Sequence, residues 1–333
     1  MSVRCYPAEK SRTLREDFPN MTNSPHFGVM VPQIKRTWQE TQRAASAFEE
    51  MGFDSLWVND HLYGPQSPAL PMLEGWTLAA GIAAVTEKPE IGTLVTPVGM
   101  RNPAHTGKMI ATVDNIAGGR IIPGFGSGWM AREFSDFGMP FVSTRDRLRQ
   151  LEEGLQIFKG MFDADQDEFS FEGEFFHTEN LVTQPKPPRD MPILVGGGGE
   201  KVTMRIAAQY ADIWNNSAGS QDDLEHKVSV LHGHAERLGR DPSEIRVSQQ
   251  CLVTIVDDDA KVQPMVERAQ KIFGGHMGNP AGDMALTGTP DMIKERVNRH
   301  MERGCDMFMI EFFGRDTIEP AQMFAETVIP EFR

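Results

Sequence analysis

The sequence predicts an α/β protein, specifically a (β/α)8 (TIM) barrel, from three observations. Past residue 24, short apolar segments alternate with helix-like segments along the whole chain. Most of the apolar segments are continuous runs, which is typical of parallel strands covered on both faces. Eight such segments occur, each followed by a helix-like segment, which is the strand count of this barrel. A doubly wound open sheet gives the same alternation, but the length of 333 residues and the strand count favour the barrel.

The eight expected strands share an apolar run that ends in glycine, proline or a polar residue. They are 27–32, 54–59, 90–97, 120–126, 192–196, 212–216, 245–256 and 306–312. Helix signals lie between them. One helix is expected to begin near Thr37 and to end at Gly52. A second begins at Asn102-Pro103, where asparagine is a good N-cap and proline suits the first turn.

Three stretches exceed ordinary loops, at 127–143, 167–190 and 262–288. Within the second, residues 169–176 read as a β-hairpin. The barrel is therefore expected to carry insertions after strands 4 and 7 and a hairpin before strand 5. Because barrel chemistry sits on the loops that follow the strands, the first and last stretches are candidates for walls or a lid of the site.

The bulk properties predict one soluble cytoplasmic domain over residues 25–333, preceded by a flexible arm over 1–24. The formal net charge of −14 argues against nucleic acid or an anionic membrane as partner. No apolar run approaches the roughly 20 residues of a membrane span. The three cysteines are widely spaced, so neither a disulfide framework nor a zinc site is expected. The histidines show no metal-ligand spacing, so no metal is expected either.

The most informative motif follows the fifth expected strand, where Gly196, Gly197, Gly198 and Gly199 precede an amphipathic helix. Glycines allow a ligand to approach the backbone N–H groups closely, and the helix N-terminus favours an anion. The segment therefore predicts a phosphate cradle, although glycines also serve simple turns. Asn216 and Ser217 end the next strand and could add side-chain donors to it.

Asp60 and His61 end the second expected strand and therefore face the mouth of the barrel. A histidine there can donate a hydrogen bond or accept a proton. The alternative is that His61 caps the following loop with Asp60 as its partner.

Gly124, Gly126 and Gly128 end the fourth expected strand, with Ser127 between the last two. The helix and acidic residue that would confirm a dinucleotide fingerprint are missing, so these glycines more simply clear space for a flat ligand beside a wall formed by Trp129. Glu133, four residues later, could cap the loop or bind the ligand.

Taken together, these motifs resemble the luciferase-like monooxygenase superfamily from about residue 27 to the C-terminus. The motifs are Trp57-Val58-Asn59-Asp60-His61, Gly92-Thr93, Arg101-Asn102-Pro103, Gly118-Gly119-Arg120, Gly126-Ser127-Gly128-Trp129 and Gly196-Gly197-Gly198-Gly199. Segments 198–203 and 75–80 look closest to a subgroup that uses the deazaflavin coenzyme F420.

The resemblance implies a TIM barrel that binds F420 or FMN at the strand C-termini. The cofactor phosphate would lie against the four glycines with help from Asn216 and Ser217. The ring would lie near Leu94, Val95, Thr96, Gly126, Ser127 and Gly128. The resemblance also implies a non-proline cis peptide at Leu94–Val95. His61 takes the position of a histidine that contacts ring or substrate, with Asp60 and Trp129 beside it in the catalytic group.

The resemblance leaves the reaction open. Relatives that oxidise sugar phosphates with F420 carry a carboxylate where this chain has Trp129, so that reaction is not expected. Hydride transfer between F420 and a small organic substrate is the preferred expectation. An FMNH2-dependent two-component monooxygenase, served by a separate flavin reductase (or an F420 reductase in the first case), is the alternative. A non-catalytic, flavin-binding or oligomerising barrel is a third possibility. Relatives commonly form dimers or tetramers, so a homo-oligomer is expected.

Overall fold

The computed structural model describes residues 24–64, 67–273, 275 and 277–333. The arm predicted for residues 1–24 lies outside the described residues except for Ser24, so the division of the chain at that point stays a prediction.

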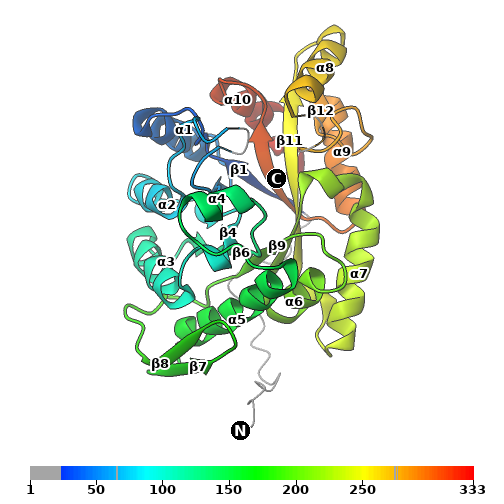
Figure 1. Cartoon of the computed structure of the whole chain (residues 1–333). Coiled ribbons are helices and arrows are strands. Elements are labelled where there is room, and N and C mark those ends of the chain that lie inside the picture. Colours follow the sequence, from blue (N-terminus) through cyan, green and yellow to red (C-terminus); the bar gives the residue numbers. More distant parts are fainter. Residues whose placement is uncertain (1–23, 65–66, 274, 276) are drawn as a thin grey trace.

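The described strands form a closed parallel barrel, as expected from the sequence (Figure 1). Following the hydrogen-bonded pairs, β13 is joined through β1, β2 and β3 to β5, and in the other direction through β11, β10 and β9 to β6. Because β5 and β6 are consecutive pieces of the fourth barrel strand, this path closes on itself. The barrel strands are β1 (His26–Met30), β2 (Ser55–Val58), β3 (Glu90–Thr93), β4 (Thr96–Pro97), β5 (Ile121–Ile122), β6 (Gly124–Gly126), β9 (Leu194–Gly196), β10 (Ile213–Asn216), β11 (Arg246–Ile255) and β13 (Met307–Phe312).

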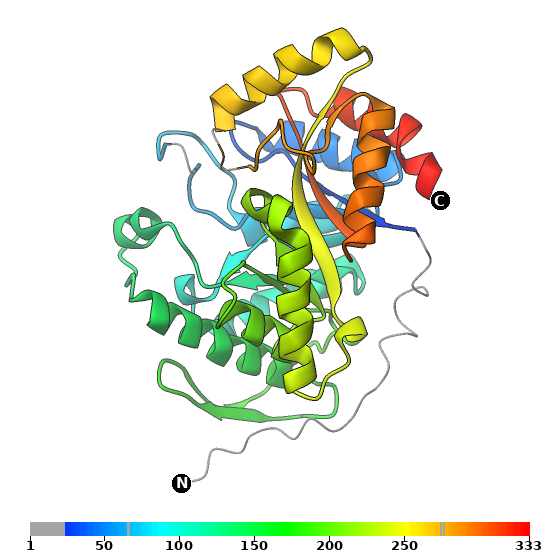
Figure 2. The ribbon, with the colours of Figure 1, turned by 90° about the vertical axis from the view of Figure 1, so that its right-hand side faces the viewer.

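Helices surround the barrel and carry the caps that the sequence predicts (Figures 1 and 2). Thr37 and Glu40 form a complete capping box at the start of α1. Asn102 accepts a hydrogen bond from the backbone N–H of His105 at the start of α3. The helices are α1 (Trp38–Glu50), α2 (Gly75–Ala83), α3 (Pro103–Ala117), α4 (Ala131–Asp136), α5 (Thr144–Phe162), α6 (Thr203–Tyr210), α7 (Leu224–Arg237), α8 (Val262–Phe273), α9 (Pro290–Glu302) and α10 (Ile318–Thr327).

The third and fourth barrel strands are each interrupted, so that eight barrel strands appear as ten segments. Ile91 pairs with Ile121 in the lower part, whereas Thr96 pairs with Phe125 in the upper part. The third strand therefore holds one residue more than the fourth between these pairs. The extra residue falls at Leu94–Val95, whose peptide bond is cis, as the resemblance implied.

The insertions occur where the sequence predicts them, but the structure differs from the prediction in the bounds of the hairpin and in the stretch 262–288. The hairpin is formed by β7 (Phe169–Glu172) and β8 (His177–Leu181), so its second strand begins one residue after the predicted segment ends. The stretch 262–288 is not mainly a loop, because α8 occupies its first twelve residues and β12 (Thr287–Gly288) pairs with β11 near its end. Val266 and Ala269 of α8 are buried, which fits a helix that lies on the barrel by one face.

Two apolar layers fix the direction of every strand side chain. The inner layer fills the barrel and comprises Met30, Trp57, Leu94, Ile122, Leu194, Ile213, Met307 and Met309. The outer layer lies between the strands and the helices, and includes Phe308, Ile310 and Phe312. Because side chains alternate along a strand, residues two apart from an inner residue also face inward. This alternation assigns the polar residues near the C-terminal strand ends to one layer or the other.

Candidate active site

A histidine and a glutamate form a close pair at the C-terminal end of the barrel. The Nδ1 atom of His61, which follows β2, lies 2.9 Å from Oε2 of Glu133 on α4. Glu133 is 1% exposed, whereas the His61 side chain keeps 16% of its surface exposed. The buried carboxylate therefore orients a ring whose other edge stays accessible.

The same carboxylate caps the loop that follows β2. Its Oε1 atom accepts hydrogen bonds from the backbone N–H groups of Leu62 and Tyr63. The hydroxyl of Tyr63 donates to Asp136 at the end of α4, over 3.1 Å. The insertion after strand 4 is thus tied to the loop after strand 2. Of the two roles considered for Glu133, loop capping is realised, across two strands rather than within its own loop.

Trp129 lies beside His61 at the edge of the site. Their rings meet edge to face with centroids 5.7 Å apart, and Trp129 is 56% exposed. The indole therefore forms an open rim above the histidine, where a ligand can reach both rings.

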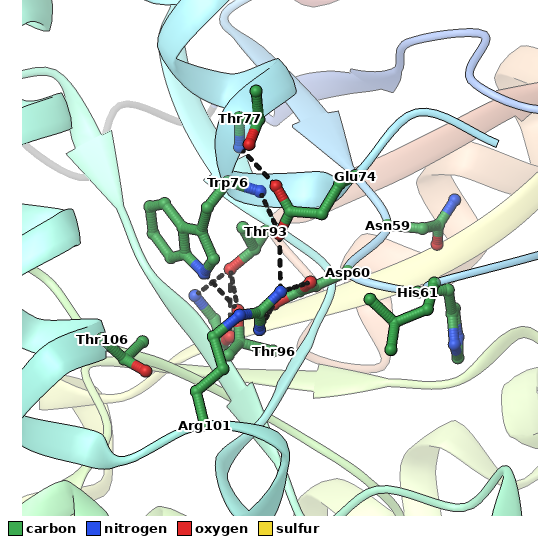
Figure 3. A network of polar contacts seen from close by, with 12 residues as sticks. Asn59, Asp60, His61, Glu74, Trp76, Thr77, Thr93, Thr96, Arg101 and Thr106 are labelled. Atoms are coloured by element: carbon green, nitrogen blue, oxygen red, sulfur yellow. Dashed lines mark hydrogen bonds and ion pairs between the residues drawn. The ribbon is translucent and has the colours of Figure 1, made fainter. Parts of the chain in front are cut away.

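Asp60 belongs to a different network, which joins it to Arg101 and Glu74 (Figure 3). Both of its carboxylate oxygens accept from the Arg101 guanidinium at 2.8 Å, and Arg101 also donates to Glu74 at 2.6 Å. Glu74 in turn caps α2 through the backbone N–H groups of Trp76 and Thr77. Burial raises the pKa of Asp60, while the Arg101 guanidinium opposes that rise. Asp60 is thus not the partner of His61; it fixes the end of β2 that carries His61.

The side chain of Thr96 also forms its hydrogen bonds outside the barrel interior. Its hydroxyl accepts from the Trp76 indole at 2.9 Å and donates to Thr93, which in turn bonds the backbone of Gly124. Only its backbone is available to a ligand in the mouth.

Val95 is the side chain that the third strand places at the mouth. It is partly exposed, and it lies between the two glycines that end β6 and β9. A Cβ atom at Gly126 would come within 2.7 Å of Val95, and one at Gly196 within 3.0 Å. Gly128 has φ +77°, which favours glycine in the turn that leads to Trp129. These glycines keep one side of the mouth flat around Val95.

The predicted cradle has room at Gly198. A Cβ atom there would meet no atom nearer than 3.8 Å, and the residue has no positive φ that would require glycine. Space next to the backbone is thus left for a ligand rather than filled by protein. Gly197, by contrast, has φ +124°, and its carbonyl oxygen accepts from the Trp214 indole at 3.0 Å.

Lys227 of α7 adds a cation beside the cradle that the motifs did not indicate. Its ammonium group donates to the carbonyl of Gly198 at 3.0 Å and to Glu200 at 2.7 Å. This contact with Lys227 lowers the pKa of the Glu200 carboxyl. Because Lys227 lies 29 residues beyond Gly198, only the fold brings the two together.

Asn216 and Ser217 lie next to the cradle, but with less freedom than predicted. The amide group of Asn216 donates to Ser220 and Gln249, on the outer face of β10, so its donors are already used. Its Oδ1 atom is buried without a partner among the described residues. The Ser217 hydroxyl lies 3.3 Å from that of Ser220. Asn215, next in the chain, is the residue that faces the barrel interior.

Together these residues fit a flat cofactor with a phosphate tail. The glycine turn offers an open backbone next to a lysine, and Val95 with its two glycines offers a flat apolar border. Within the described residues, no three His, Cys, Asp or Glu side chains are arranged to hold a metal ion.

Comparison with known proteins identifies the family of this chain. The family model for luciferase-like monooxygenases matches residues 21–284. The chain is 30% identical over 314 residues to an F420-dependent glucose-6-phosphate dehydrogenase from Kineococcus radiotolerans, which covers 86% of this chain and 90% of the relative. It is 26% identical over 287 residues to an FMNH2-dependent dimethylsulfone monooxygenase from Pseudomonas putida, covering 74% and 77% of the two chains.

The fold has a solved counterpart as well. An F420-dependent secondary alcohol dehydrogenase, solved with an F420-acetone adduct, superposes with a TM-score of 0.79 at 21% identity, covering 93% of this chain and 99% of the other. These relatives and neighbours are oxidoreductases that depend on F420 or FMN. With the barrel and the sequence motifs in agreement, the chain belongs to the luciferase-like monooxygenase family.

Proposed function

We propose that this chain transfers a hydride between coenzyme F420 and a small organic substrate. The observation that carries the proposal is that an oriented histidine, paired with Glu133, shares one end of the barrel with the open glycine turn at Gly198. A cofactor and a proton-transfer group can therefore meet over the same strand ends. The choice of F420 is supported by the 30% identical relative, whose match spans 86% of the chain.

Each part of the site has a task in this proposal. Gly196, Gly197, Gly198 and Gly199 hold the cofactor phosphate with their backbone, helped by the charge of Lys227 and by Ser217. Val95, Gly126 and Gly128 border the ring, together with the backbone of Leu94, Thr96 and Ser127. When bound, a deazaflavin supplies a carbon that gives or accepts a hydride.

The side chains then handle the accompanying proton. His61, held by Glu133, exchanges a proton with the substrate at its exposed edge. Trp129 shields that edge from one side. Asp60 acts through position, because its pairing with Arg101 fixes the end of β2.

A second candidate is an FMNH2-dependent monooxygenase fed by a separate flavin reductase. The relative from Pseudomonas putida, with a match over 74% of this chain, favours it. A protein of this kind needs a dry pocket for oxygen chemistry, and α8 with Trp129 would have to close over the mouth. We further propose, as the resemblance suggests, that the chain acts as a homodimer or homotetramer. No helix in the described part of the chain is both long and apolar enough to cross a membrane.

A binding titration tests the proposal. The full chain is titrated with F420 and with FMN, each oxidised and anaerobically reduced. Tight binding of F420 with weak binding of FMN is the expected result. Tight binding of reduced FMN alone would replace the proposal with the monooxygenase. Binding of neither would overturn both.

A further inference from the structure

A carboxyl group on the last barrel strand faces the mouth of the barrel. Along β13, Met307 and Met309 belong to the inner layer, whereas Phe308, Ile310 and Phe312 belong to the outer layer. Glu311 continues the inner series, two residues beyond Met309 towards the C-terminal strand end. Its side chain therefore points into the barrel at the end where the cradle and His61 lie.

The surroundings of Glu311 are apolar. In the parallel pairing of β11 with β13, Glu311 is the register partner of Leu252. Leu252 belongs to a small apolar cluster with Met277 and the neighbouring Phe273 and Phe313, which α8 helps to form. No described residue forms a hydrogen bond or an ion pair with the Glu311 carboxyl group. Burial raises the pKa of this carboxyl to about 7, and no charged neighbour contributes to that rise.

Glu311 also lies across the barrel from Gly126 of the fourth barrel strand, next to which Val95 lies. Four strand-to-strand steps separate β13 from the fourth barrel strand in either direction around the barrel. β2, which leads into His61, is two steps from each of them. A substrate between the proposed ring site and β13 would therefore have His61 on one flank and Glu311 opposite the ring.

From this placement we infer that Glu311 is a second acid–base group of the site; the inference rests on the function proposed above. The Glu311 carboxyl group hydrogen-bonds the oxygen of a ketone or aldehyde substrate, or of the corresponding alcohol. A neutral carboxyl donates one hydrogen bond to a carbonyl oxygen, which satisfies both groups without burying a charge. An ammonium substrate would require two buried charges in this apolar wall, which costs more.

The step balances with the proposed cofactor. The carbonyl carbon gains a hydride, so that the C=O double bond becomes a C–O single bond, while the substrate oxygen takes the proton from the Glu311 carboxyl. The substrate is reduced by two electrons and the deazaflavin is oxidised by two. The carboxylate left behind recovers its proton from the new hydroxyl group as His61 protonates that oxygen, so one proton is taken up in all, and His61 regains it from solvent. In the opposite direction the Glu311 carboxylate accepts the alcohol proton.

A pair of probes tests this inference through binding. Cyclohexanone and methylenecyclohexane have similar shapes, but only the ketone accepts a hydrogen bond. Their dissociation constants are measured by ligand-observed NMR on the full chain saturated with oxidised F420, at pH 6 and pH 8.5. In the wild type we expect the dissociation constant of the ketone, divided by that of methylenecyclohexane, to be about tenfold higher at pH 8.5 than at pH 6. The reason is that the ionised Glu311 carboxylate no longer donates a hydrogen bond.

Two variants separate hydrogen bonding from shape. Glu311→Gln keeps an N–H donor and should favour the ketone equally at both pH values. Glu311→Leu removes the donor and should show the unfavourable ratio at both. Glu319→Gln, an exposed position on α10, is the control and should match the wild type.

A wild-type ratio that does not change with pH would overturn the inference, and so would a Glu311→Leu variant that keeps at pH 6 the ratio of the wild type at pH 6. Failure of the ketone to bind the wild type at either pH would overturn it as well. Failure of the proposed function has a different signature, namely that neither F420 nor FMN binds the wild type. The probe series on the cofactor-free chain would then still report on Glu311.

Discussion

His61 and Glu133 lie 72 residues apart in the chain, yet Nδ1 of the first is 2.9 Å from Oε2 of the second. The contact joins the loop after strand 2 to the insertion after strand 4. One carboxylate thereby orients the candidate acid–base group and satisfies two backbone N–H groups of the loop. In the proposed function, catalysis and local stability therefore depend on the same side chain.

Replacement of Glu133 should therefore affect both. Glu133→Ala leaves the buried N–H groups of Leu62 and Tyr63 without their acceptor, which costs about 1–3 kcal/mol of unfolding free energy. Urea unfolding measures the loss, and hydrogen exchange should increase over residues 61–63. Asp136→Ala, which removes the hydrogen bond from the Tyr63 hydroxyl and an exposed ion pair with Arg132, should leave the exchange of the Leu62 amide unchanged. Equal exchange in both variants would contradict the capping role.

His61→Ala should slow turnover far more than it weakens cofactor binding. Loss of a positioned acid–base group typically lowers the rate by about 10²-fold or more, whereas the cradle is untouched. Turnover with any accepted substrate and a cofactor titration measure the two effects. His105→Ala, at an exposed position on α3, is the control. Wild-type turnover in His61→Ala would remove this residue from the catalytic group.

Gly198→Ala should show the reverse pattern. The added Cβ meets no protein atom closer than 3.8 Å, so the fold tolerates it, but it occupies the space that we propose for the phosphate. We expect the dissociation constant of the cofactor to rise about tenfold, which corresponds to about 1.4 kcal/mol. The control is Gly233→Ala in the middle of α7, which is the same substitution away from the glycine turn and should not change the affinity for the cofactor. Unchanged affinity in Gly198→Ala would mean that the phosphate binds elsewhere.

Breaking the pair of Asp60 and Arg101 should destabilise the barrel. Arg101→Met leaves the fully buried Asp60 carboxylate without its guanidinium partner, at a cost of about 3–5 kcal/mol. The double variant Asp60→Asn with Arg101→Met removes both charges and should lose less than the sum of the two single changes. Urea unfolding of the three variants measures this coupling. Strict additivity would argue against a coupled pair.

Glu311 should make stability depend on pH. Because its pKa is raised to about 7 in the folded protein, folding retains a proton that the unfolded chain releases above its ordinary value near 4.3. Its contribution to the unfolding free energy therefore falls as pH rises from about 4.3 to 7, by up to about 4 kcal/mol, and stays constant at higher pH.

The comparison of pH 5 and pH 8 checks this effect. Glu311→Gln cannot titrate, so it should gain stability relative to the wild type on going from pH 5 to pH 8. Glu319→Gln should follow the wild type. A constant difference between Glu311→Gln and the wild type at the two pH values would show that the carboxyl titrates in its ordinary range.

Several positions of the candidate site could be located from the sequence because they carry local signals. The glycine turn at 196–199 and the residues after β2 stand at strand ends that apolar runs mark clearly. The helix caps at Thr37 and Asn102 are also set by neighbours within four residues. The helix α8 was missed, although Val266 and Ala269 have the spacing of a buried helical face.

Other positions could not be predicted, because strands buried on both faces do not show which way a side chain points. The apolar run of β13 shows no in–out alternation in the sequence. The inward direction of the Glu311 side chain follows only from the inner and outer layers to which its neighbours belong. For the same reason the sequence did not indicate that the side chains of Asn216 and Thr96 point away from the barrel interior.

The sequence by itself determined the family, the barrel and the order of its strands, because apolar runs, glycine turns and caps are local properties. The tertiary structure alone decided which side chains meet. The pairs His61–Glu133, Asp60–Arg101 and Gly198–Lys227 each join separate elements of the barrel. Barrel closure brings such segments to one end, and only the resulting geometry shows which charge faces which partner.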